Sequence, residues 1–171
     1  LFNYKGAGLS IMEMSHRSKE YDAVHQAAIS YLTDLLNIPS NYHVLFLQGG
    51  ASQQFAMLPM NLAHNNQPID MIHTGSWTKK AIGELKKGYQ CHVVASSEDD
   101  NFLKLPDLDQ VTFNDNSAYT YMCSNNTIFG TQFKSFPSHA KSPLVVDMSS
   151  EILSRQLDIS DFGVIFAGAQ K

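Results

Sequence analysis

Two residues near the end of the chain, Asp147 and Lys171, have the types and the positions for cofactor chemistry. An apolar run at 144–146 ends on Asp147, and a second run at 162–167 leads through a small-residue turn to Lys171. Such runs are typical of buried parallel strands, whose carboxyl ends bind ligands. A carboxylate and a lysine there suit pyridoxal phosphate, which the lysine binds as a Schiff base while the acid keeps the pyridine nitrogen protonated. A strand-end aspartate and a surface lysine are an equally good interpretation of these two residues alone.

A glycine-rich turn earlier in the chain has the features of an anion site. We predict a strand at Val44–Leu47, then the turn Gln48–Gly50, then a helix that begins near Ser52. The free N–H groups at such a helix start can bind a phosphate. The turn lacks the lysine of a P-loop and the spacing of a dinucleotide fingerprint, so a plain tight turn stays open as the alternative. Pro59 is expected to kink this helix or to end its regular part.

Three further side chains stand at positions where either a binding role or a structural role is open. Trp77 falls on a strand-to-helix loop, where an indole could stack on a flat ring, although a core tryptophan is the usual case. His16 and Arg17 lie near a helix start, where the helix dipole does not favour a cation. They could serve an anion there, but spacing alone favours a solvated arginine and a packed histidine.

The composition indicates an ordinary globular domain and excludes several partners. The chain has 171 residues, a net charge of −4 and 43% hydrophobic residues, enough for one domain. The mildly acidic balance argues against nucleic acid. No apolar run reaches the length of about 18 residues that a membrane helix needs, and no signal peptide opens the chain. Cys91 and Cys123 fit a reduced, cytoplasmic setting, with one disulfide left open, and the histidines show no metal-ligand spacing.

The repeated unit of strand, polar loop and helix predicts the fold class. We expect a helix capped by Ser15 or Ser18 that ends at Asn37, and a second helix at 78–87 closed by Gly88. Further strands are expected at 69–73, 92–95 and 118–122. This pattern predicts an α/β domain with a mostly parallel central sheet and helices on both faces. Because the chain lacks an initial methionine and stops directly after a strand, we expect an incomplete piece of a longer protein.

Taken together, the loops resemble the phosphoserine aminotransferase family, pyridoxal-phosphate enzymes of fold type I. The similarity extends over nearly the whole chain, in the family's order, and the first and last of its stretches are the most specific. The matching stretches are MEMSHRSKE, VLFLQGGASQQFAM, TGSWTKKA, CSNNTIFGT, PLVVDMSSEILSR and FGVIFAGAQK.

The resemblance implies a role for each matching residue. Lys171 carries the cofactor and Asp147 pairs with its ring nitrogen, so these two are the catalytic residues. Trp77 stacks on the ring and Thr127 bonds a polar edge of the cofactor. The further residues implied are Ala51, Ser52 and Gln170 at the cofactor phosphate, and Arg17 with His16 at the acidic groups of the substrate.

The resemblance also implies an activity and partners. Residues 1–171 correspond to the N-terminal part of the large cofactor-binding domain, and the family continues into the rest of that domain and a small domain. The implied reaction moves an amino group between L-glutamate and 3-phosphooxypyruvate, in a homodimer with its active site at the interface. A phosphorylated keto acid of vitamin B6 synthesis is a possible second substrate. The alternatives are another fold type I aminotransferase, a desulfurase, or an inactive fragment. A hydrolase is a weaker alternative, because Gly75-Ser-Trp77 lacks the second glycine of a nucleophile elbow.

Overall fold

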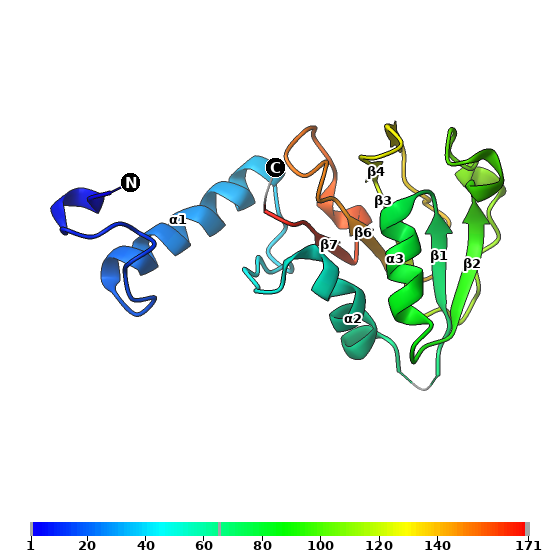
Figure 1. Ribbon diagram of the computed structural model, residues 1–171, viewed down its shortest axis with the longest axis horizontal. Helices are drawn as coiled ribbons and strands as arrows, with labels where there is room; N and C mark the ends of the chain where they lie inside the picture. Colours follow the sequence, from blue (N-terminus) through cyan, green and yellow to red (C-terminus); the bar gives the residue numbers. More distant parts are fainter. Residues whose placement is uncertain (1, 65, 170–171) are drawn as a thin grey trace. The chain divides into compact units, whose positions relative to one another are not determined.

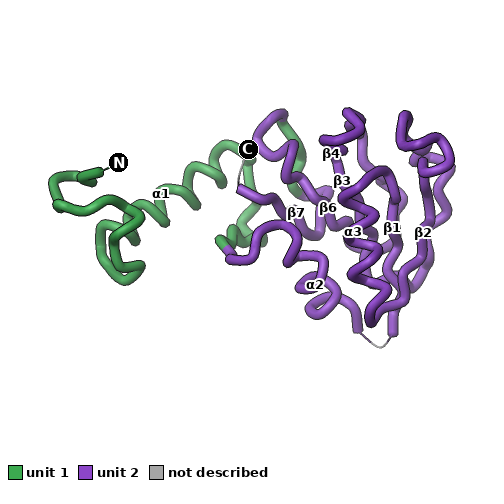
Figure 2. The backbone as a smooth tube through the Cα atoms, in the orientation of Figure 1, with its two compact units in different colours: residues 1–46, 156–159 green, residues 47–155, 160–171 purple. Residues whose placement is uncertain are grey.

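The computed structural model describes residues 2–64 and 66–169. The chain divides into two compact units, which Figure 2 shows in different colours. The first unit comprises residues 1–46 with 156–159, and the second comprises residues 47–155 with 160–171.

The first unit is built around one long helix. A short 3₁₀ turn, η1 (Tyr4–Gly6), precedes α1 (Lys19–Leu36). The Ser18 side chain accepts a hydrogen bond from Tyr21 N at 3.2 Å, and Asn37 closes the helix in the left-handed conformation. These are the start and the end that the sequence predicted, since a serine hydroxyl satisfies a free N–H at a helix start and asparagine tolerates positive φ.

The second unit contains a five-stranded sheet in which each neighbouring pair runs parallel (Figure 1). Its strands, in spatial order, are β2 (Cys91–Ser96), β1 (Ile69–His73), β3 (Thr120–Cys123), β6 (Leu144–Asp147) and β7 (Val164–Phe166). The predicted α/β class with a parallel sheet is confirmed. From β1 the chain moves outward to β2 and then crosses back to β3, so the direction of winding reverses beside β1. In open α/β sheets, ligands bind at the carboxyl ends of the strands next to such a reversal.

Two helices cover one face of this sheet (Figure 1). They are α2 (Gly50–Leu62) and α3 (Ser76–Leu85), which pack against each other. Their apolar residues form one core with alternate residues of the strands, among them Phe55, Leu85, Met71 and Tyr121. Strand residues of the opposite parity, such as Ile72, are equally buried, as expected for a parallel sheet covered on both faces.

The predicted strand at 44–47 is wrong. The segment has no strand structure, and Leu45, Phe46 and Leu47 are 70%, 52% and 56% exposed. A strand exists only where a neighbour accepts its backbone hydrogen bonds. No strand of the described residues pairs with this run, so its apolar character alone does not make it one.

Helix boundaries also differ from prediction at two places. α2 continues through Pro59 to Leu62, so Pro59 does not end the helix, and a kink at Pro59 stays a prediction. α3 begins at Ser76, two residues before the predicted start, and ends at Leu85, before Gly88.

The remaining elements are short. A two-stranded hairpin of β4 (Asn125–Asn126) and β5 (Thr131–Gln132) follows β3. The remaining 3₁₀ turns are η2 (Glu98–Asp100), η3 (Leu108–Gln110) and η4 (Ile159–Asp161). Over the described part of the chain, no helix combines the length and the apolar character needed to cross a membrane.

Candidate functional site

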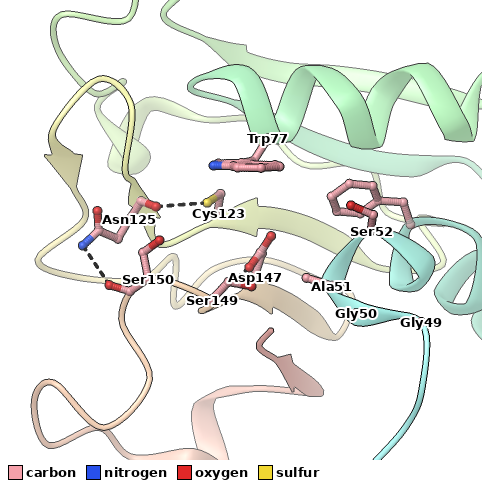
Figure 3. Close-up of a pocket in the computed structure, with 11 residues that line it drawn as sticks. Gly49, Gly50, Ala51, Ser52, Trp77, Cys123, Asn125, Asp147, Ser149 and Ser150 are labelled. Carbon is pink, nitrogen blue, oxygen red and sulfur yellow. Dashed lines mark hydrogen bonds between the residues drawn. The ribbon is translucent and has the colours of Figure 1, made fainter. Parts of the chain in front are cut away.

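A pocket of about 220 Å³ lies at the carboxyl ends of β3 and β6, beside the starts of α2 and α3. It belongs entirely to the second unit. The side chains and backbone groups around it are those of Gly49, Gly50, Ala51, Ser52, Phe55, Trp77, Cys123, Asn125, Asp147, Ser149 and Ser150 (Figure 3). Four of the predicted cofactor-binding residues, Ala51, Ser52, Trp77 and Asp147, therefore share one pocket.

The start of α2 forms one end of the pocket. Gly49 and Gly50 have φ values of +94° and +61°, which glycine adopts without strain, and they turn the chain into the helix. No side chain at Gly49 caps the helix, so the first N–H groups are not taken by an N-cap residue. Ala51 and Ser52 lie in this first turn. Backbone N–H groups and the positive end of the helix dipole together favour a phosphate here.

Asp147 is the last residue of β6 and only 4% exposed. Its Oδ1 accepts a hydrogen bond from Ser149 N at 2.9 Å, and its carbonyl oxygen accepts one from Ser124 N at 3.1 Å. The first bond orients the carboxylate, and the second fixes the backbone of Asp147 beside Cys123, its partner on β3. A buried carboxylate that is fixed in this way can hold a cationic N–H group of a ligand.

Trp77 lies in the first turn of α3, directly after the carboxyl end of β1. Figure 3 shows its indole edge-on, across the pocket from Asp147 and Ala51. The Lys80 ammonium lies over the ring, 4.5 Å from its centroid. Trp77 is partly buried, so the indole contributes a flat apolar wall against which a heteroaromatic ring can stack.

The hairpin after β3 forms the polar side of the pocket. Asn125 Nδ2 donates to Ser150 O at 3.2 Å, and the Cys123 thiol donates to Asn125 O at 3.3 Å (Figure 3). The Thr127 hydroxyl is exposed and hydrogen bonds the Ser150 hydroxyl. Thr127 does not line the pocket itself, but it touches a residue that does.

Two buried groups show the electrostatic character of this edge. Burial raises the pKa of the Tyr121 phenol well above its ordinary value, and the negative charge of Asp147 raises it further. Burial lowers the pKa of His73, at the end of β1, and the charge of Glu98 opposes that shift. Tyr121 and His73 are therefore neutral at pH 7.

The other predicted residues lie elsewhere or outside the described part. Gln170 and Lys171 are not among the described residues. The loop that leads to them is anchored at the pocket, because Gly168 N donates to the Ser149 hydroxyl at 3.0 Å. His16 and Arg17 belong to the first unit, where both are exposed in the turn before α1.

Sequence reasoning gave no role to several residues that line the pocket. Phe55, Cys123, Asn125, Ser149 and Ser150 are all pocket residues. A signal for most of them is present in the sequence, because small polar residues directly follow β3 and β6. Phe55 carries no such signal, since a helix phenylalanine at apolar spacing is ordinary core.

Comparisons with known proteins agree over the whole chain. The family model for aminotransferase class-V matches residues 1–171. A phosphoserine aminotransferase of Geobacillus kaustophilus (strain HTA426) is 53% identical over 171 residues, which are 100% of this chain and 47% of that protein. One of Bacillus subtilis (strain 168) is 50% identical over 169 residues, 99% of this chain and 46% of that protein. This chain thus spans about half the length of the curated relatives that it matches.

Solved structures give the same result. One is a phosphoserine aminotransferase structure from a study of radiation damage to the Schiff base. It superposes on this chain with a TM-score of 0.96 at 47% identity, and the match covers 100% of this chain and 48% of that one. The enzyme from Bacillus circulans subsp. alkalophilus has a TM-score of 0.94 at 51% identity, with 99% and 47% of the two chains covered. This chain therefore belongs to the class-V aminotransferase family.

Proposed function

We propose that the native protein carrying these residues is a phosphoserine aminotransferase. In this proposal it uses pyridoxal phosphate to move an amino group from L-glutamate to 3-phosphooxypyruvate, giving 2-oxoglutarate and O-phospho-L-serine. Residues 1–171 would then be the N-terminal part of its large cofactor-binding domain. The observation that carries the proposal is one pocket that combines a helix start, an indole face and a fixed buried carboxylate.

The residues present fit this cofactor at three points. The N–H groups of Ala51 and Ser52 at the start of α2 suit its phosphate. The indole of Trp77 suits the face of its ring, and Asp147 suits its ring N–H. An anion site, an aromatic wall and a carboxylate in a single pocket match the three chemically different parts of pyridoxal phosphate.

When bound, pyridoxal phosphate supplies an electron sink for negative charge that develops at the substrate Cα. Asp147 keeps a proton at the ring nitrogen, because its buried charge favours the cationic form of a neighbouring N–H. Trp77 holds the plane of the ring, and Thr127 donates or accepts a hydrogen bond at its polar edge. We propose that Lys171 Nζ bonds the cofactor and moves the proton at the substrate Cα, which requires a neutral amine. Arg17, with His16 beside it, binds the acidic groups of the substrate.

A covalent label tests the cofactor site. The native protein is incubated with pyridoxal phosphate, reduced with borohydride, digested and mapped by peptide mass. The expected result is a pyridoxyl adduct on Lys171. An adduct only on another lysine, or none, would refute the proposed function. Assays with glutamate and either 3-phosphooxypyruvate or a phosphorylated keto acid of vitamin B6 synthesis then identify the acceptor.

A matched pair of variants tests the role of Asp147. Asp147→Asn keeps the shape but removes the charge, and we expect a roughly ten- to hundredfold lower transamination rate, the size of one lost charge-assisted hydrogen bond. The control is Asp70→Asn, because Asp70 is also fully buried but lies near the amino end of β1, where it accepts from Asn114 N at 2.8 Å. Equal rates in the two variants would remove Asp147 from the proposed mechanism.

We also propose a homodimer in the cytoplasm. Among the described residues Cys91 and Cys123 both carry a thiol group, which suits a reducing compartment. Sedimentation of the native protein tests the dimer, and fractionation of the source cells tests the location.

A further inference from the structure

The hydroxyl of Thr78, next to Trp77, is the centre of a buried hydrogen-bond network at the start of α3. Thr78 is 0% exposed. Its Oγ1 accepts from Thr74 N at 3.0 Å and from Gly75 N at 3.1 Å. The same oxygen lies 2.9 Å from Gly75 O and 2.8 Å from His73 Nδ1. One hydroxyl thus binds every residue of the turn between β1 and α3.

The hydroxyl has no spare hydrogen-bonding capacity. It offers two lone pairs and one hydrogen, and the two backbone N–H groups occupy the lone pairs. Its hydrogen is then left for Gly75 O or for the neutral His73 ring. A side chain of the same shape without the oxygen would leave two buried N–H groups unpaired, which is costly in the interior of a protein.

A second part of the network joins this turn to the hairpin after β3. Thr74 Oγ1 donates to Asn126 Oδ1 at 3.1 Å, and Asn126 Nδ2 donates to Thr131 Oγ1 at 3.1 Å. Asn126 O also accepts from Gly130 N at 2.8 Å. Thr74 and Asn126 are 0% and 1% exposed, so the bond between them is shielded from water.

The backbone of the turn comes close to side chains of the hairpin at the same place. A Cβ at Gly75 would lie 3.0 Å from Asn126 Oδ1 and 3.1 Å from the Phe129 ring. The turn and the hairpin are therefore in direct contact, and an added methyl group would require the Asn126 or Phe129 side chain to shift. Trp77 follows this turn by two residues, while Asn125 and Thr127 flank Asn126 on the hairpin.

We propose that Thr78 is a positioning residue that, through Thr74 and Asn126, fixes the indole of Trp77 relative to the Asn125–Thr127 side of the pocket. The network has no direct contact with a ligand, because Thr74, Thr78 and Asn126 do not line the pocket. It acts on the cofactor indirectly, because it sets the orientation of the Trp77 indole and of the residues 125–127. The inference rests on the proposed function for its cofactor readout.

The test compares Thr78→Val and Thr78→Ser in the native protein. The matched control is Ser117→Ala, because the Ser117 hydroxyl is another buried centre of hydrogen bonds. It accepts from Asp70 N at 3.1 Å and lies 3.1 Å from Pro68 O. Ser117 stands at the amino ends of β1 and β3, away from the pocket at the carboxyl ends. Both Thr78→Val and Ser117→Ala should lower the melting temperature, since each removes a buried hydroxyl.

Two readouts separate positioning from stability. The first is acrylamide quenching of Trp77 fluorescence without cofactor, taken as the difference from the Trp77→Phe protein. The second is the dissociation constant of pyridoxal phosphate and the circular dichroism of the bound cofactor. In Thr78→Val we expect about twofold stronger quenching and about tenfold weaker cofactor binding with altered dichroism, which matches the loss of a typical buried hydrogen bond. Thr78→Ser should restore both, and Ser117→Ala should change neither.

The inference is overturned if Thr78→Val loses stability as Ser117→Ala does but keeps wild-type quenching and cofactor affinity. If Thr78→Val does not fold, Thr74→Val removes only the bond to Asn126 and must give the same two changes. If the wild-type protein binds no pyridoxal phosphate, the proposed function fails, and Trp77 quenching alone decides the role of Thr78.

Discussion

α1 and α3 are both helices with one apolar face, but within the described part of the chain only α3 buries that face. α1 has 18 residues and none of them is buried, and Tyr31 and Leu35 are each 66% exposed. α3 has 10 residues and buries four of them, including Thr78 and Leu85. Helical spacing of apolar residues thus predicts that a helix forms and which face is apolar. It does not predict how much of that face the surrounding residues cover.

The same difference separates two arginines. Arg155, in the second unit, donates from Nε to the buried Glu151 at 2.5 Å and from its other nitrogens to Phe133 O and Lys134 O at 2.8 and 3.0 Å. Arg17, in the first unit, is exposed, and its guanidinium makes no hydrogen bond to the described residues. An arginine that donates from all three of its nitrogens stabilises a fold, whereas one whose guanidinium makes no such bond remains available for a ligand.

The largest effect that we expect is on stability, from Arg155→Ala. This change leaves the Glu151 carboxylate buried without its cation, which costs about 3–5 kcal/mol of unfolding free energy. Urea unfolding of the native protein measures the cost. A loss below about 1 kcal/mol, the range of exposed pairs, would mean that the ion pair is solvated in solution.

Arg17→Ala is the matched change in the first unit. We expect an unchanged unfolding midpoint, and a loss of about 2–5 kcal/mol in kcat/KM for the phosphorylated keto acid if Arg17 binds its acidic groups. Steady-state kinetics at low substrate give this value. Wild-type kcat/KM would show that Arg17 is only a surface residue.

The two helices are compared directly by removing one leucine from each. Leu85→Ala takes a side chain that is 2% exposed out of the core and should cost about 2–5 kcal/mol. Leu35→Ala changes a residue that is 66% exposed, so the contacts that Leu35 makes within residues 2–64 and 66–169 predict a loss of unfolding free energy below about 0.5 kcal/mol. Both are measured by urea unfolding of the native protein. A Leu35→Ala cost near that of Leu85→Ala would mean that further residues cover the apolar face of α1.

The sequence predicted well those elements that local chemistry determines. Ser18 and Asn37 mark the two ends of α1, and the apolar runs of β1 and β6 are strands at the predicted places. These predictions succeed because a capping hydroxyl, a left-handed asparagine and a buried strand each act within a few residues.

Elements that depend on distant partners were predicted less well. The run 44–47 is as apolar as β6, but no strand within 2–64 and 66–169 pairs with it, so it is not a strand. The hairpin of β4 and β5 is held by contacts such as Thr74 Oγ1 to Asn126 Oδ1, which join residues 52 positions apart. Nothing in the local sequence indicates such a pair. For the same reason, the polar residues after β3 and β6 could be noticed, but their meeting in one pocket could not be derived from their spacing.

The smallest expected effect is the pH dependence of stability that comes from His73. This histidine is buried beside the start of α3, unlike the exposed side chains of α1. Burial lowers the pKa of His73. The negative charge of Glu98 raises this pKa by a smaller amount, and the positive charges of Lys79 and Lys86 lower it further. As pH falls below the ordinary histidine value of about 6.5, the unfolded chain takes up a proton that the folded chain does not. The stability contribution of neutral His73 is therefore fully present above that pH. It is lost as pH falls from about 6.5 to the lowered pKa of the folded protein.

NMR titration of His73 gives its pKa directly, and the slope of stability against pH in that window should be smaller in His73→Asn than in wild type. An NMR pKa at or above 6.5 would mean that His73 is hydrated, and that its ring does not share the Thr78 hydroxyl in the way the 2.8 Å contact indicates.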